Sequence, residues 1–136
     1  MNAKRKVPRG IRNNNPLNII IGNTWLGERP NPTDDRFEEF TAMEYGCRAA
    51  FIILRRYIRR YHKNTVAQIV HKWSPDGGTI EDAYIRTVCS RMGIDKDQPI
   101  DYNDKTTMCA LVAAMAFVEN GQTISEVAIE KGYQLA

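Results

Sequence analysis

The chain has 136 residues, of which 43% are hydrophobic and 26% charged, as is ordinary for a soluble globular protein with one core. Its net charge of +3 is too small to indicate nucleic-acid binding, and no apolar run approaches the ~20 residues that span a bilayer. The basic N-terminus lacks the apolar segment of a signal peptide. We therefore expect a disordered basic tail at residues 1–8, a single domain at 9–136 and a monomer without a membrane span.

An amide-rich segment opens the domain. Asn13, Asn14 and Asn15 precede Pro16, and asparagines before a proline favour a turn over helix or strand. The β-prone run 19–21 follows, and prolines in the loop 29–35 forbid helix there. This pattern predicts a small β-hairpin within residues 18–40. The amides could bind an uncharged, N-acetylated sugar polymer, or they could simply turn the backbone.

Helical periodicity dominates the rest of the chain. Thr41 to Glu44 and Thr65 to Gln68 fit capping boxes, and Gly93 and Gly121 fit helix C-caps. The predicted helices span residues 41–63, 65–73, 79–92, 103–119 and 125–131. The predicted fold class is therefore α+β, mainly α.

The three cysteines, Cys47, Cys89 and Cys109, each lie in an apolar helical pattern, which predicts reduced, largely buried thiols. His62 and His71 have the setting of surface histidines. We therefore predict no metal site and no cofactor.

Arg55, Arg56, Arg59 and Arg60 lie away from the apolar stripe of the first long predicted helix. They could bind phosphate, but a charge run on a helix is more often a solvated face. Nucleic-acid binding through these arginines is a third hypothesis for function. It is disfavoured by the modest net charge, so we expect no nucleic-acid partner.

Glu119 continues an apolar stripe formed by Met108, Leu111, Val112 and Met115. Burial and the negative end of the helix dipole both disfavour the ionised carboxylate and raise its pKa. A carboxyl that is protonated near neutral pH can donate a proton to the leaving oxygen of a glycosidic bond. The alternative is a glutamate at a helix end that bends out to water.

These motifs resemble a known family. Glu119-Asn120-Gly121, closing an Ala-rich helix, is similar to the Glu-Ser-Gly that ends the catalytic helix of lysozymes and lytic transglycosylases. The segment from Asn13 to Ile19, with Trp25-x-Gly27 and Phe37-x-x-Phe40, resembles the hairpin region of bacterial N-acetylglucosaminidases of the flagellar-muramidase type. The chain order is reversed here, as in a circularly permuted lysozyme-like fold. The opening also resembles small phage virion and cell-wall-lysis proteins.

The resemblance implies cleavage of the β-1,4 glycan strand of bacterial peptidoglycan, by hydrolysis or lytic transglycosylation, with Glu119 as general acid. We favour Asp35 as a second carboxylate because loop carboxylates stay ionised, although lytic transglycosylases need none. Asn13, Asn14 and Asn15 would bind the sugar strand, and Trp73 and Tyr84 would either stack on sugars or belong to the core. Without a signal peptide, a phage particle, holin or secretion machine would deliver the protein to the wall. The competing hypothesis is a non-catalytic phage structural or wall-binding module.

Overall fold

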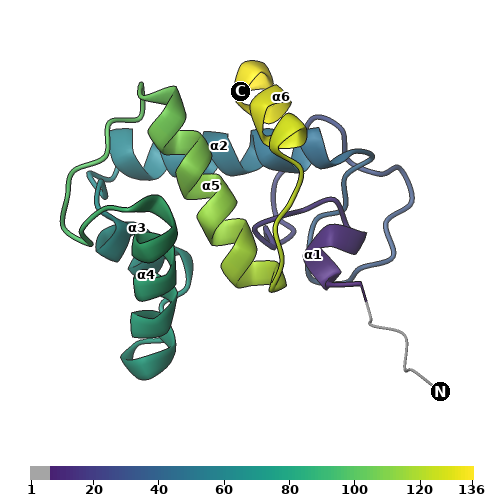
Figure 1. Cartoon of the computed structure of the whole chain (residues 1–136). Coiled ribbons are helices and arrows are strands. Elements are labelled where there is room, and N and C mark those ends of the chain that lie inside the picture. The colour runs from purple at the N-terminus through teal and green to yellow at the C-terminus, as the bar shows by residue number, and fades with distance from the viewer. Residues whose placement is uncertain (1–6) are drawn as a thin grey trace.

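The computed structural model describes residues 7–136, so most of the predicted tail at residues 1–8 lies outside the described residues. The described chain contains six helices: α1 (Arg9–Arg12), α2 (Met43–Arg59), α3 (Val66–Trp73), α4 (Gly78–Met92), α5 (Lys105–Asn120) and α6 (Glu126–Leu135). Figure 1 shows α5 and α6 crossing the long helix α2, with α3 and α4 to one side and α1 near the C-terminal end of α5. The five predicted helices are confirmed, and the short α1 was not predicted.

The predicted capping boxes had different outcomes. Thr65 caps α3 as expected, since its hydroxyl accepts a hydrogen bond from the Gln68 backbone N–H at 3.2 Å. The box at Thr41 was wrong: the N-cap of α2 is Ala42, which has no side-chain cap. The Thr41 hydroxyl instead donates to the Gly27 carbonyl at 3.1 Å, because a contact with the preceding loop competes with the local cap.

The predicted β-hairpin within residues 18–40 was wrong, and so was the α+β class. Within the described chain this segment forms only two isolated antiparallel bridges, Ile20 with Phe37 and Glu28 with Phe40. The Asp34 side chain takes the Arg36 N–H, which a longer ladder would pair with the Ile21 carbonyl, and carboxylates also bond other N–H groups of the loop. Glu39 accepts from the Thr33 N–H, and Asp34 accepts from the N–H groups of Arg36 and Phe37. The fold of residues 7–136 is therefore helical, with an irregular, carboxylate-bonded loop.

The hydrophobic core lies between α2, α5 and the turn that precedes the loop. Leu17, Phe40, Phe51 and Met115 are among its fully buried side chains. The close approach of α2 and α6 depends on Gly132, because a Cβ there would lie 2.5 Å from the Cys47 Cβ. This packing leaves no space for a larger residue at that position.

All three cysteines are free thiols, as predicted. Cys47 is fully buried, and burial raises the pKa of its thiol to about 12. Cys89 and Cys109 are only half-buried. The predicted burial is therefore confirmed for Cys47 and is only partial for the other two cysteines.

Between residues 7 and 136, no helix combines the length and the apolar character that crossing a bilayer requires.

Candidate active site around Glu119

Glu119 is the penultimate residue of α5, and its neighbours fix that end of the helix. Gly121 adopts the left-handed conformation with φ 69° and ends α5 as its C-cap. The buried Asn120 amide donates to the Pro16 carbonyl at 2.8 Å and to the Ala116 carbonyl at 2.9 Å. The end of α5 is thereby tied to the Asn-rich turn, although the sequence separates them by 104 positions.

The Glu119 carboxylate is half-buried and has a partner on each oxygen. Its Oε1 accepts a hydrogen bond from the Asn18 amide at 3.0 Å, and its Oε2 accepts one from the Tyr84 hydroxyl at 2.9 Å. Burial raises the pKa of Glu119 above its ordinary value, the two hydrogen bonds lower it in part, and the charge of Asp76 raises it. The sequence left two alternatives for Glu119, a core-facing carboxyl or one that bends out to water. The structure shows the carboxyl in contact with the protein and not extended into bulk water.

Each hydrogen-bond partner of Glu119 also lines a surface hollow, and Glu119 itself lines neither of the two. Asn18 lines a hollow of about 230 Å³, which α2 and α3 complete through Ile53, Tyr57 and Trp73. Tyr84 lines another of about 360 Å³ on α4. Glu119 is therefore linked to the two hollows through the hydrogen bonds from Asn18 and Tyr84.

The predicted aromatic residues both lie near this site. The Tyr84 ring is buried in the core, and only its hydroxyl serves Glu119. Burial and the neighbouring Glu119 carboxylate raise the pKa of Tyr84 well above its ordinary value. Trp73 is half-buried, and its ring lies 6.0 Å from that of Tyr57 in a tilted arrangement. Trp73 therefore presents part of its surface to the hollow beside Asn18, whereas Tyr84 contributes a polar atom.

The three predicted amides of the turn mainly hold the protein backbone. Asn13 and Asn15 are buried, and the Asn15 amide donates to the carbonyls of Ile19 and Glu38, both at 3.0 Å. The Asn13 amide donates to Asp34 at 2.9 Å, and that of half-buried Asn14 donates to the Phe40 carbonyl at 3.1 Å. The structure thus favours the alternative in which these side chains shape the turn. Asn18, a few residues later, is the amide that meets Glu119.

Gly10 lets the turn approach α5 closely. A Cβ at Gly10 would lie 2.4 Å from the Asn120 Oδ1, 2.8 Å from the Asn15 carbonyl oxygen and 3.1 Å from the Asn18 Oδ1. The Oδ1 atoms of Asn18 and Asn120 are buried and have no hydrogen-bond partner in the described chain. Both oxygens lie close to the position that a Cβ at residue 10 would occupy. Gly10 therefore helps to set the position of the Asn18 amide on Glu119.

Asp35, the predicted second carboxylate, is not brought to Glu119. Its side chain is 97% exposed and lies 3.5 Å from the Arg9 guanidinium. The preceding Asp34 is the structural residue: its side chain is buried, and Arg9 donates to both of its oxygens at 2.6 and 2.7 Å. This ion pair, aided by backbone N–H groups, holds the pKa of Asp34 well below its ordinary range.

Glu38 and Glu39, which follow Asp35 closely in the sequence, are both buried. Burial and the adjacent Glu28 carboxyl raise the pKa of Glu38 to about 7. The acidic group whose charge acts on Glu119 is instead Asp76, in the loop before α4. Among the described residues, no group of three His, Cys, Asp or Glu side chains is placed to hold a metal ion.

Sequence reasoning did not identify Asn18 or Asp76 as site residues. Asn18 adopts φ 54°, a left-handed conformation that asparagine tolerates better than most residues. The signal that could have identified Asn18 is its position in the segment from Asn13 to Ile19, which resembles the hairpin region of the wall-lytic enzymes. Asp76 carries no motif and could be found only from the folded structure.

Comparison with known proteins finds a phage relative. Protein P5 of Pseudoalteromonas phage PM2 is 38% identical to this chain over 133 aligned positions, which cover 93% of this chain and 80% of the relative. No protein-family profile matches the sequence.

Proposed function

This chain belongs to the family of Protein P5 of phage PM2, and we propose that it cleaves the β-1,4 glycan strand of peptidoglycan with Glu119 as general acid. The observation that carries the proposal is the half-buried Glu119 carboxyl, hydrogen-bonded to Asn18 and Tyr84, each of which lines a surface hollow. The phage relative supports an association with phage, and the resemblance of the sequence motifs to wall-lytic enzymes supports the substrate.

The proposed chemistry follows from the state of Glu119. Its raised pKa increases the fraction of protonated carboxyl near neutral pH, and protonated Glu119 donates its proton to the oxygen of the scissile glycosidic bond. Asn18 and Tyr84 orient the carboxyl and stabilise the carboxylate that remains after proton transfer. Activity then falls as the pH rises through the pKa of Glu119.

The exposed position of Asp35 argues against its role as a second carboxylate. A second carboxylate would have to lie within about 5–10 Å of the general acid to act as nucleophile or base in a canonical glycosidase. Asp35 is paired with Arg9 on α1, and no contact joins it to Glu119 in the described structure. We therefore propose that Asp35 takes no part in cleavage. Lytic transglycosylation needs no second carboxylate, and in hydrolysis Asp76 would be the carboxylate whose charge reaches Glu119.

The test is Glu119→Gln, which keeps the shape of the side chain and removes the acid. We expect loss of at least about a hundredfold in release of soluble muropeptides from purified peptidoglycan, in line with general acid catalysis. Glu126→Gln, at an exposed position at the start of α6, is the control. Mass spectrometry of the products distinguishes anhydro-sugar ends, which transglycosylation leaves, from reducing ends. Full release by a folded Glu119→Gln protein would refute the acid role.

The structural use of the Asn-rich turn favours a second candidate function, a phage structural or wall-binding module without catalysis. The buried Asn13 amide donates to the Asp34 carboxylate and the buried Asn15 amide donates to backbone carbonyls, so neither is free to bind sugar. A protein that binds purified peptidoglycan but releases no muropeptides, with or without Glu119, would support this alternative.

A further inference from the structure

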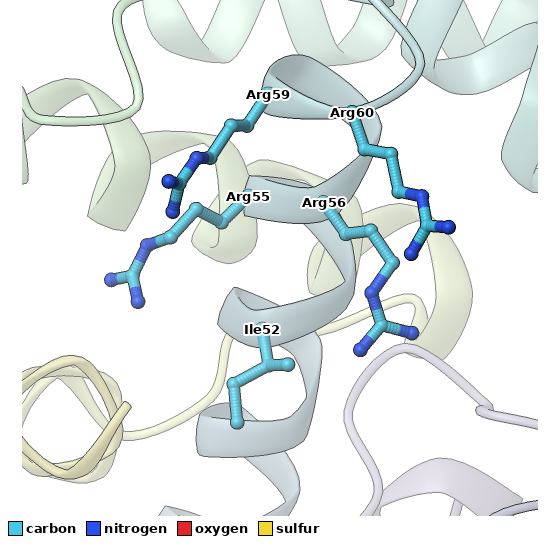
Figure 2. A pocket seen from close by; sticks show the side chains of 5 residues that line it. All are labelled: Ile52, Arg55, Arg56, Arg59 and Arg60. Carbon is cyan, nitrogen blue, oxygen red and sulfur yellow. The ribbon is translucent and has the colours of Figure 1, made fainter.

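Four arginines of α2 form a cationic surface that the proposed catalytic step does not use. Arg55, Arg56, Arg59 and Arg60 line, with Ile52, a surface hollow of about 440 Å³ (Figure 2). Arg56, Arg59 and Arg60 are exposed, and Arg55 is half-buried. We call this set the arginine surface.

The arginine surface is unpaired within residues 7–136. None of its guanidinium groups has a carboxylate within 4.0 Å, whereas Arg9, Arg12 and Arg29 each form an ion pair. Arg55 and Arg59, like Arg56 and Arg60, are spaced four residues apart, so that like charges are neighbours and repel one another on the helix. An anionic ligand would relieve this repulsion.

The arginines form two rows that diverge to opposite sides of α2, Arg55 with Arg59 and Arg56 with Arg60 (Figure 2). The two rows differ in their angular position around α2 relative to the residues that line the hollow beside Asn18. With about 100° of rotation per helical residue, Arg60 lies roughly 20° around the helix from Ile53 and 60° from Tyr57. Ile53 and Tyr57 line the same hollow as Asn18. Arg55 and Arg59 lie roughly 120–160° from Ile53 by the same geometry.

We propose that the row of Arg56 and Arg60 binds carboxylates of the stem peptides that branch from the peptidoglycan glycan strand. This inference rests on the proposed function, because it places the glycan in the hollow beside Asn18 and its anionic branches on the adjacent face of α2. The guanidinium fork matches a carboxylate through two parallel hydrogen bonds.

Duplex DNA is the less favoured ligand. A surface with four guanidiniums offers at most four phosphate contacts, and the chain as a whole carries a net charge of only +3. The position of one row beside the candidate sugar-binding hollow is explained by a branched glycan and not by DNA. DNA binding is therefore an outcome that the experiment must exclude.

The test measures retention on insoluble purified peptidoglycan, with every variant carrying Glu119→Gln so that the polymer is not consumed. We compare Arg56→Gln/Arg60→Gln with Arg55→Gln/Arg59→Gln, and with the control Arg86→Gln/Lys131→Gln. The control removes the same charge from exposed positions on α4 and α6. Circular dichroism checks that all variants are folded.

Loss of two exposed Arg–carboxylate contacts corresponds to about a two- to thirtyfold weaker affinity. We expect that loss for Arg56→Gln/Arg60→Gln, a smaller one for Arg55→Gln/Arg59→Gln, and little change for the control. The differences should vanish on peptidoglycan whose carboxylates have been amidated, and on glycan strands stripped of peptides. Equal losses of affinity in all three double variants would overturn the proposal, as would differences that persist on stripped glycan. Binding of the same variants to a DNA duplex is measured in parallel, and a loss of affinity for DNA without a loss for peptidoglycan would also overturn it.

The two proposals can fail separately. Cleavage of peptide-free glycan by protein with intact Glu119 tests the catalytic proposal without stem peptides. Binding in the Glu119→Gln background tests the arginine surface without catalysis. If the protein binds peptidoglycan as predicted but cleaves neither intact peptidoglycan nor peptide-free glycan, the proposal for the arginine surface stands and the catalytic proposal is refuted.

Discussion

Gly46, in the second turn of α2, offers a test in which helix propensity and tertiary packing predict opposite signs. Replacing a glycine by alanine inside a helix normally stabilises it by about 1 kcal/mol. A Cβ at Gly46, however, would lie 1.9 Å from the carbonyl oxygen of Asn14 and 2.9 Å from the Pro16 Cδ. The obstacle is backbone, and the turn is held by the hydrogen bond from the Asn14 amide to the Phe40 carbonyl.

The expected size of the effect follows from these distances. Ordinary contact begins at 3.4 Å, so the turn must move by about 1.5 Å, which places the cost near the upper end of the ~1–3 kcal/mol range for overpacking. After the gain in propensity, Gly46→Ala should lower the free energy of unfolding by about 2 kcal/mol. With a urea dependence of about 2 kcal/mol per molar, the unfolding midpoint falls by about 1 M.

The measurement is urea unfolding followed by circular dichroism, with Gly22→Ala as control. A Cβ at Gly22 meets nothing within 4 Å, so that variant should unfold close to the parent protein. Because the displaced turn also carries Asn18, Gly46→Ala should lose peptidoglycan cleavage as well. A Gly46→Ala protein as stable as the parent, or more stable, would refute the packing argument.

Two further substitutions test the electrostatics. Asp34→Asn removes the charge that accepts two hydrogen bonds from Arg9, and should cost about 1.5–3 kcal/mol of unfolding free energy at neutral pH. Because the pKa of Asp34 is depressed in the folded state, its contribution is present above the ordinary value of 3.8 and is lost as the pH falls below it. The free energy of unfolding should therefore fall less steeply with decreasing pH in Asp34→Asn than in the parent protein. An equally steep fall in both proteins would contradict this. Tyr84→Phe removes a hydrogen bond that lowers the pKa of Glu119. Its pH–activity profile should therefore extend to higher pH, and a shift to lower pH would contradict the assignment.

The helices could be predicted from the sequence because their signals are local. At the N-termini, Thr65 and Ser125 each accept a hydrogen bond from the backbone N–H three residues later. At the C-termini, Gly93 and Gly121 adopt the left-handed conformation that ends a helix. Each of these features depends on residues within one helical turn.

The loop before α2 could not be predicted because its partners are distant and are side chains. The spacing of apolar residues between 18 and 40 is that of a hairpin, and a sequence pattern does not show that Glu39 or Asp34 will bond the backbone instead. Asn13 and Asn15 were singled out correctly as unusual, but their function is to hold this loop. Asn18 contacts Glu119 across 101 positions of sequence, a separation at which spacing carries no information.

The pair Glu119–Asn120 shows how one helix end can serve both folding and chemistry. Asn120 is buried and its amide fastens α5 to Pro16, while the half-buried Glu119 carboxyl accepts hydrogen bonds from Asn18 and Tyr84. Because Asn18 belongs to the same turn as Pro16, the contact that fastens the helix also sets the distance from the Asn18 amide to the carboxyl. The acidity of Glu119 is therefore coupled to the packing of the turn. A substitution that moves the turn without contacting Glu119 should change the pH dependence of activity together with stability.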